Sequence, residues 1–178
     1  MENYKVKKLI GHEEIEQRVR EVASEVNHDY AGKDPILAVV LKGGFVFAAD
    51  LVRMLDVPFT IEFVGTSSYD GAVSSGDIRI TKDLDISITD RHLLLVEDIV
   101  DTGLTLHVLC DLFEQRKPRS ITIATMLLKD IERPFDLPLG YVGFGVPNKF
   151  VVGYGLDYNE RYRGLPYIGY IESNTVGE

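Results

Sequence analysis

Hydrophobic residues along the first part of the chain follow two alternating patterns. Between residues 12 and 28 they recur every three or four positions among charged side chains, which predicts an amphipathic helix. Residues 35–41 (PILAVVL) form a short, continuous hydrophobic run rich in β-branched residues, the pattern of a strand buried on both faces. A Lys-Gly-Gly turn and a second helical pattern over residues 45–56 follow it. Strand, glycine turn and helix in this order indicate the beginning of a βαβ unit.

The same alternation continues along the chain. Three more segments have strand-like patterns: residues 58–68, 92–97 and 120–128. A helical pattern that contains Cys110 separates the last two. This order predicts an α/β fold with a mostly parallel, twisted sheet flanked by helices. Because ligands bind such sheets at the carboxyl ends of the strands, we expect the site in three loops, those after Leu41, Glu97 and Leu128.

Two further segments have other patterns. Residues 67–77 are rich in Ser, Gly and Asp, and residues 78–80, Leu84 and residues 86–90 after them look like strands of a hairpin. Residues 67–77 are then either a solvent-exposed hairpin loop or a flexible hairpin lid, because lids need glycine hinges and polar tips. From about residue 141 to residue 178, short aromatic segments are spaced by glycines, which predicts a small cap on the main sheet.

Composition narrows the classes of protein. The 178 residues fit one domain, residues 1–178, and 28 acidic residues against 19 Lys and Arg give a net charge of −9, which argues against broad binding to nucleic acid or anionic membrane. The N-terminal segment has no hydrophobic stretch of the signal-peptide kind, and the longest hydrophobic run is too short to span a bilayer. We therefore expect a cytoplasmic location. Cys110 is the single cysteine and lies in a periodic hydrophobic segment, so a buried structural thiol is favoured over a reactive one.

The chemistry is concentrated in residues 95–105 (LVEDIVDTGLT), where a strand pattern gives way to a helix pattern. The first turn of a helix has free backbone N–H groups and a positive dipole end, so it suits a phosphate. Gly103 allows close approach, and the hydroxyls of Thr102 and Thr105 add donors. The alternative is a simple helix N-cap, for which Asp or Thr is common.

The carboxylates beside this turn argue against a simple cap. Two acids at the end of a buried strand, Glu97 and Asp98, cost several kcal/mol unless solvent, hydroxyl donors or a cation satisfy them. A sugar diol with Mg²⁺ nearby supplies both. A ligand with a phosphate for the loop and a diol for the acids is a ribose 5-phosphate.

Residues 93–106 (LLLVEDIVDTGLTL) closely resemble the phosphoribosyl pyrophosphate signature of the type I phosphoribosyltransferases. Three other blocks resemble the hypoxanthine-guanine phosphoribosyltransferases in particular: residues 41–53, 67–80 and 149–169. The resemblance implies the type I phosphoribosyltransferase fold, with a small hood from the chain ends and a homodimer or homotetramer. It also implies Mg²⁺-dependent transfer of phosphoribose from phosphoribosyl pyrophosphate to N9 of a 6-oxopurine, a reaction of purine salvage.

The resemblance further implies roles for individual residues. Asp101 would be the catalytic residue that takes or shares the purine N7 proton. The phosphoribosyl pyrophosphate ligands would be Lys42, Gly43, Ser68, Tyr69, Glu97, Asp98, Thr102, Gly103, Leu104, Thr105 and Arg163. The purine would contact Lys129, Phe150, Val151 and Asp157, and the metal would lie near Glu97, Asp98 and Asp157. Leu104 stands where some family members have lysine, and the peptide bond before Lys42 can be cis in the family.

Two alternatives stay open at this point. A related enzyme could use xanthine, adenine or a pyrimidine, although Lys129 favours a 6-oxo group because its ammonium can only donate hydrogen bonds. A regulator that senses phosphoribosyl pyrophosphate and binds nucleic acid should carry a basic stripe or an added module, and the sequence has neither.

Overall fold

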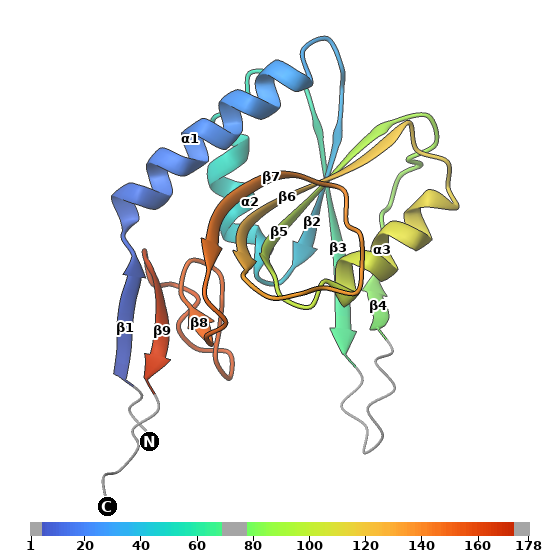
Figure 1. Ribbon diagram of the computed structural model, residues 1–178. Coiled ribbons are helices and arrows are strands. Elements are labelled where there is room, and N and C mark those ends of the chain that lie inside the picture. Colours follow the sequence, from blue (N-terminus) through green and yellow to red (C-terminus); the bar gives the residue numbers. More distant parts are fainter. Residues whose placement is uncertain (1–4, 69–77, 173–178) are drawn as a thin grey trace, which may run out of the picture.

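The computed structural model describes residues 5–68 and 78–172, and its centre is a six-stranded sheet (Figure 1). The strands follow the order β4-β3-β2-β5-β6-β7, with β4 antiparallel to β3 and all other neighbours parallel. Their bounds are β2 Ile36–Leu41, β3 Thr60–Ser68, β4 Ile78–Lys82, β5 His92–Val100, β6 Ser120–Lys129 and β7 Leu139–Val146. The predicted α/β fold with a mostly parallel sheet is confirmed.

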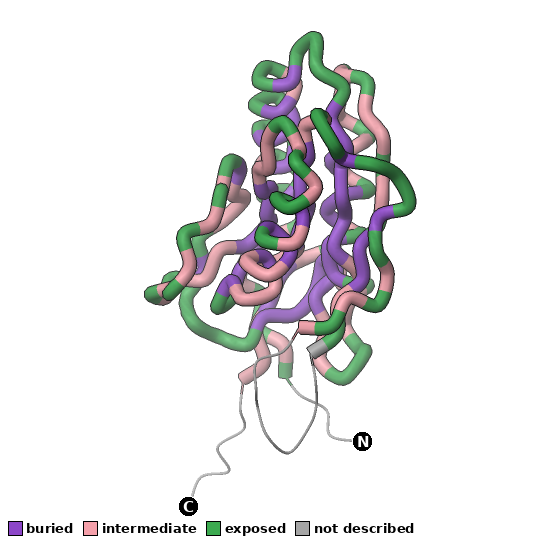
Figure 2. Tube along the Cα trace, turned by 90° about the vertical axis from the view of Figure 1, so that its right-hand side faces the viewer, coloured by how far each residue is buried: buried purple, intermediate pink, exposed green. Residues whose placement is uncertain are grey.

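Helices cover both faces of this sheet. Helices α1 (His12–Asp29) and α2 (Gly44–Val52) pack on one face, and α3 (Leu104–Glu114) packs on the other (Figure 1). Alternate residues of β2 and β5 belong to the two hydrophobic cores, which is why these strands are hydrophobic without interruption. The central strands are accordingly buried along most of their length (Figure 2). Cys110 is on the buried face of α3, as its pattern predicts.

A second, three-stranded antiparallel sheet forms the cap and joins segments from both ends of the chain (Figure 1). Its order is β1 (Lys5–Ile10), β9 (Ile168–Glu172) and β8 (Val151–Val152). Residues 153–167, which we call the cap loop, connect β8 to β9. Tyr154 in this loop donates a hydrogen bond to the Asp50 carboxylate of α2 at 2.7 Å, which fixes the loop against the main sheet's helical layer.

The cap was expected to begin near residue 141, but residues 139–146 form β7, an edge strand of the main sheet. Its glycines suggested short strands and turns, but they allow close packing on β6. A Cβ atom at Gly140 would lie 2.3 Å from the Thr122 side chain, and one at Gly143 would lie 2.4 Å from the Met126 carbonyl oxygen. Glycine here marks close approach within the sheet.

Residues 86–90 were expected to form a strand, and this expectation is wrong. The segment is a turn in which Asp90 has a φ of 58° and its N–H donates to the Lys117 carbonyl. The Thr89 hydroxyl donates to the Arg116 carbonyl at 3.0 Å, so the segment is bonded to the turn after α3 and not to a neighbouring strand. Ile88 is buried in the core under α3, which explains the hydrophobic pattern.

The hairpin partner of β4 is β3, and β4 forms the antiparallel edge of the main sheet. The lid expected at residues 67–77 falls almost wholly on residues 69–77, which lie outside the described residues, as does Tyr69. Within residues 5–68 and 78–172, no helix has the length and hydrophobicity required to cross a membrane.

Candidate active site

A cavity of about 300 Å³ lies where the parallel strands end. It is lined by the end of β2 and its turn, by the segment from β5 into α3, and by two residues of the cap loop, Asp157 and Arg163. The carboxyl ends of adjacent parallel strands meet at one edge of a sheet, so the loops after Leu41 and Glu97 come together as predicted.

Glu97 and Asp98, at the end of β5, form an acidic pair in this cavity. Glu97 is only 7% exposed. Burial raises the pKa of the Glu97 carboxyl well above its ordinary value, and the neighbouring Asp98 charge raises it further. Burial also raises the pKa of Asp98, although hydrogen bonds and the Arg163 charge oppose that rise. Both pKa values are raised, so the surrounding described residues do not fully stabilise the two negative charges. The pair is therefore suited to hydroxyl donors or a cation.

The turn after β2 packs directly against this pair. A Cβ atom at Gly43 would lie 1.5 Å from the Asp98 Oδ2 atom, and one at Gly44 would lie 2.9 Å from the Val96 carbonyl oxygen. Both positions therefore require glycine. The peptide bond between Leu41 and Lys42 is cis, the geometry that the resemblance implied.

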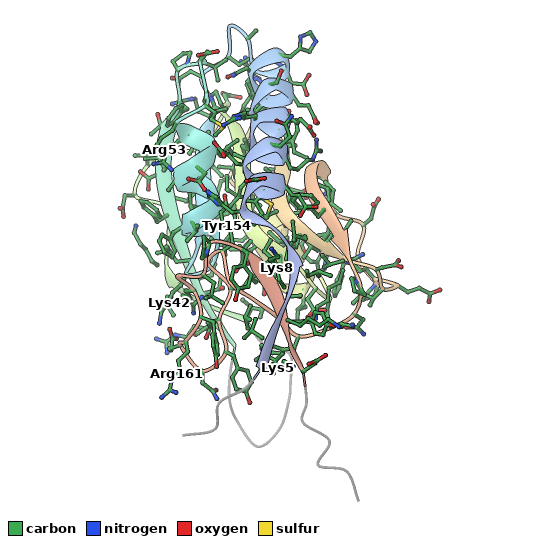
Figure 3. The ribbon with its side chains drawn as sticks, turned by 90° about the vertical axis from the view of Figure 1, so that its left-hand side faces the viewer. Lys5, Lys8, Lys42, Arg53, Tyr154 and Arg161 are labelled. Atoms are coloured by element: carbon green, nitrogen blue, oxygen red, sulfur yellow. The ribbon has the colours of Figure 1, made fainter. Side chains whose placement is uncertain are left out.

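The cap loop covers the same turn from the other side. A Cβ atom at Gly155 would lie 2.3 Å from the Gly43 carbonyl oxygen, and Gly155 has a φ of +99°. The exposed Lys42 side chain forms an ion pair with Glu160 of the cap loop at 2.9 Å. In Figure 3, Lys42 accordingly lies near Arg161, on the side of the molecule that also carries Tyr154. The cap loop and the turn after β2 thus form one wall of the cavity.

The segment from Asp101 to Thr105 links β5 to α3. Gly103 is the residue before the helix and has a φ of +82°, a conformation that glycine adopts without strain. Gly103 has no side chain to cap the helix, and the Leu104 N–H donates to the Thr102 hydroxyl oxygen at 3.4 Å. Residues 102–105, at the N-terminus of α3, line the cavity, a position that suits an anion.

Asp101 and Lys129 meet at the edge of the cavity. The Lys129 Nζ atom donates to the Asp101 Oδ2 atom at 2.5 Å, and the lysine side chain is 11% exposed whereas the aspartate is half exposed. Lys129 ends β6, and Asp101 follows β5, so the neighbouring parallel strands bring the two together. The pair offers a hydrogen-bond donor and a proton acceptor side by side.

Arg163 and Asp157 form the remaining charged group. Arg163 pairs with Asp157 at 2.8 Å and Glu160 at 3.3 Å, and donates to the Gly155 carbonyl at 2.7 Å. The Arg163 Nε atom is buried and has no hydrogen-bond partner among the described residues. A buried donor without a partner beside an anion-suited loop fits an additional anionic group of a ligand.

Comparisons with known proteins show the family to which the chain belongs. A family model of the phosphoribosyl transferase domain matches residues 6–159. The chain is 48% identical over 167 residues to the hypoxanthine-guanine phosphoribosyltransferase of Bacillus subtilis, covering 93% of each chain. It is 41% identical, with a TM-score of 0.89, to a crystal structure of a hypoxanthine-guanine phosphoribosyltransferase from Bacillus anthracis, covering 96% of this chain and all of that one.

The chain belongs to the phosphoribosyl transferase family. The resemblance carried by residues 41–53, 93–106 and 149–169 is therefore confirmed at the level of the family. The chain is also 44% identical over its full length to the bifunctional protein TilS/HprT of Listeria monocytogenes, of which it spans 28%.

The predicted site residues of this phosphoribosyl transferase fall into four groups. Those that line the cavity are Lys42, Gly43, Glu97, Asp98, Asp101, Thr102, Gly103, Leu104, Thr105, Asp157 and Arg163. Lys129 is connected to the cavity through Asp101. Phe150 and Val151 lie in the cap at the start of β8, where the Phe150 ring is 55% exposed and stands edge-on to Tyr158. Ser68 ends β3 beside the residues that are not described.

The carboxylates of this phosphoribosyl transferase site fit Mg²⁺ only if a bound ligand supplies further oxygen atoms. Among the described residues no three His, Cys, Asp or Glu side chains are placed to hold a metal ion together. Mg²⁺ usually binds through one or two carboxylates together with waters and substrate phosphates, instead of an all-protein cage. The acidic pair provides two such carboxylates, so the site fits a metal that is completed by a bound ligand.

Arg133 lies beside the site but was not singled out from the sequence. Its guanidinium donates to the Asp101 carbonyl at 2.9 Å. Arg133 lies in the loop after β6, four positions after Lys129. No sequence motif surrounds it. Only its contacts in the folded chain distinguish it from a solvated arginine.

Proposed function

We propose that this chain transfers the 5-phosphoribosyl group from phosphoribosyl pyrophosphate to N9 of hypoxanthine or guanine, giving IMP or GMP and pyrophosphate. The observation that carries the proposal is the Lys129–Asp101 pair at 2.5 Å, beside the acidic pair and the helix N-terminus of one cavity. The names of the Bacillus relatives support the same reaction.

The sugar phosphate half of the site uses two elements. Backbone N–H groups of residues 102–105, with the hydroxyls of Thr102 and Thr105, hold the 5-phosphate at the start of α3. Glu97 and Asp98 accept hydrogen bonds from the ribose hydroxyls, which compensates the burial of their charges. These contacts fix C1 of the ribose next to the position of the base.

The base half of the site uses the Lys129–Asp101 pair. The Lys129 ammonium donates to the purine 6-oxo group, and the Asp101 carboxylate accepts the N7 proton as N9 forms its bond to ribose C1. The exposed ring of Phe150 provides a flat surface for the purine, whose other edge meets Val151 and Asp157. A 6-amino purine would present a second donor to Lys129, so it is disfavoured.

The leaving group departs as the bond between ribose C1 and the pyrophosphate oxygen breaks. Backbone groups of Lys42 and Gly43, together with the partly unsatisfied guanidinium of Arg163, hold pyrophosphate on the side opposite the base. The lid expected at residues 67–77, with Ser68 and Tyr69 over the pyrophosphate, falls almost wholly outside the described residues and stays a prediction.

Mg²⁺, when bound, would supply positive charge that offsets the charge of the pyrophosphate. Glu97 and Asp98 would hold it from the protein side, and Asp157 would lie near a second ion. The enzyme acts in the cytoplasm as a homodimer or homotetramer, and residues 1–178 form a single domain.

One assay tests the reaction. The purified chain is incubated with phosphoribosyl pyrophosphate, Mg²⁺ and hypoxanthine, guanine, xanthine or adenine in turn, and nucleotide formation is followed by absorbance. We expect turnover with hypoxanthine and guanine and much slower turnover with adenine. A preference for adenine, xanthine or a pyrimidine would contradict the proposed base, and no transfer to any base would contradict the reaction itself.

A further inference from the structure

The Arg133 guanidinium lies between the two loops that carry Asp101 and Lys129. Its Nε atom donates to the Asp101 carbonyl at 2.9 Å, and one terminal nitrogen donates to the Ile131 carbonyl at 3.2 Å. The other terminal nitrogen donates to the Val100 carbonyl at 3.3 Å and to the Lys129 carbonyl. One side chain thus contacts backbone acceptors after β5 and at the end of β6.

This arrangement restricts how the two loops lie relative to each other. A guanidinium is planar and rigid, and it presents five N–H donors in fixed directions. The guanidinium donates to two carbonyls at the end of β5 and to two at the end of β6. Neither segment can shift without losing some of these hydrogen bonds. The backbones of Asp101 and Lys129 are therefore held at a spacing that lets their side chains meet at 2.5 Å.

The stem of Arg133 and its neighbours also rest on the phosphate-binding turn. A Cβ atom at Gly103 would lie 2.9 Å from Leu137 Cδ1 and 3.7 Å from Arg133 Cδ. The Phe135 ring stacks on the His107 ring of α3 with centroids 4.3 Å apart. The loop after β6 is thereby packed on α3, so Arg133 is a fixed part of the scaffold.

We propose that Arg133 is a positioning residue that sets the geometry of the Lys129–Asp101 pair and thereby aligns the base with ribose C1. This inference rests on the proposed function and deepens it. Four of the five N–H donors of Arg133 go to backbone carbonyls, so its role is to hold Asp101 and Lys129 in place. Its loss misaligns the base half of the site and leaves the sugar phosphate half in place.

The first test is Arg133→Met, which keeps the aliphatic stem over Gly103 and removes every donor. Misplacement of reacting groups by about 1 Å costs about 100-fold in rate, so we expect kcat to fall by about that factor. The KM for the purine should rise, whereas the Kd for phosphoribosyl pyrophosphate with Mg²⁺, measured by calorimetry, should stay within about threefold of wild type because the phosphate turn keeps its own donors.

Arg133→Lys provides the conservative comparison. Lysine keeps the charge but its single nitrogen cannot span both loops, so we expect a loss of about tenfold in kcat, between wild type and Arg133→Met. A folded Arg133→Lys protein with wild-type kcat would overturn the proposal, including in the case where Arg133→Met does not fold. A large loss of phosphoribosyl pyrophosphate affinity with unchanged kcat would also overturn it, by indicating direct anion binding.

Arg18→Met is the matched control. Arg18 of α1 also donates to two backbone carbonyls, those of Gly143 and Val142 in β7, at 3.1 and 2.8 Å, but it does not line the cavity. Its loss should lower the melting temperature and leave kcat unchanged. Equal losses of kcat in the Arg18 and Arg133 variants would show a general structural effect and overturn the proposal.

A structural measurement separates this inference from the proposed reaction. In a crystal structure of the Arg133→Met protein, the distance between Lys129 Nζ and Asp101 Oδ2 should exceed the 2.5 Å of the wild type. An unchanged distance would overturn the positioning role whether or not the enzyme uses a purine. An inactive wild-type protein with an opened pair in the variant would instead contradict only the proposed function.

Discussion

Lys129 and Asp101 are 28 positions apart in the sequence, and their side chains form an ion pair of 2.5 Å at the edge of the cavity. The lysine is nearly buried, so without this partner its ammonium would be poorly solvated. In the proposed reaction, the pair satisfies both groups before a base binds with its own acceptor and its own proton. Ligand binding therefore exchanges one set of hydrogen bonds for another, which limits the cost of desolvation.

Replacing Asp101 with asparagine should remove the proton acceptor and preserve the shape of the site. General base catalysis contributes about 10²–10⁴-fold, so we expect single-turnover rates with hypoxanthine to fall by that order while the Kd for phosphoribosyl pyrophosphate changes little. Asp136→Asn, in an exposed position of the loop after β6, is the control and should behave as wild type. A wild-type single-turnover rate for Asp101→Asn would refute the base assignment.

Replacing Lys129 with glutamine should weaken the distinction between 6-oxo and 6-amino purines, because an amide both donates and accepts hydrogen bonds. A hydrogen bond to a charged group contributes about 1.5–3 kcal/mol, so the ratio of kcat/KM for hypoxanthine over adenine should fall by about 10- to 100-fold. Lys33→Gln, which removes a lysine next to α1 that bonds to the Asp29 carbonyl, should leave the ratio unchanged. An unaltered ratio for Lys129→Gln would exclude the contact.

Replacing Gly43 with alanine should displace the acidic pair, because the new Cβ would overlap the Asp98 Oδ2 atom. Overpacking costs about 1–3 kcal/mol, and the displaced carboxylate should weaken binding of phosphoribosyl pyrophosphate with Mg²⁺. Gly145→Ala is the control, since nothing lies within 4 Å of a Cβ at that position. Calorimetry and thermal melts would check both variants, and tight binding by Gly43→Ala would contradict the packing argument.

Replacing Glu97 with glutamine should stabilise the ligand-free protein while it impairs ligand binding. Burial raises the pKa of Glu97, so its ionised form opposes folding at neutral pH, whereas glutamine carries no charge. A gain of about 1 kcal/mol corresponds to about 2–4 °C in melting temperature. Glu132→Gln, at an exposed position, should change neither property. A lower melting temperature for Glu97→Gln would show that the charge is well compensated.

Most of the cavity lies where the order of strands and loops predicts it. Parallel strands bring their carboxyl ends to one edge, so the positions of Glu97, Asp101 and Lys129 follow from the buried strand patterns alone. Only the family resemblance singles out Lys129 and Arg163, because an isolated lysine or arginine has no local signature of function.

Other features depend on contacts that a linear pattern does not contain. The glycines of β7 pack against β6, so their spacing resembles that of turns although the strand is continuous. Ile88 enters the core from a turn, so residues 86–90 resemble a strand. Arg133 acquires its role only when two loops fold around its guanidinium. Such tertiary relationships override local patterns.

Cys110 gives a prediction that does not involve the active site. The thiol is 5% exposed, and burial raises its pKa from 9.0 to about 12, with further contributions from the charges of Glu114 and Asp111. Because the thiolate is the reactive form, this higher pKa lowers the reactive fraction at about pH 8 by about 1,000-fold. We expect labelling by a disulfide reagent to be slow in the folded protein and fast in denaturant.

The same shift gives a pH dependence of stability. The folded pKa lies above the unfolded value, so the contribution of the neutral thiol is fully present below about pH 9 and is lost as the pH rises from 9 toward 12. Cys110→Ala removes this titration, and its free energy of unfolding should fall less steeply than that of wild type across that interval. Denaturant melts at several pH values would measure both slopes. Parallel slopes, or rapid labelling of the native protein, would place the Cys110 thiol in contact with solvent and contradict its structural role.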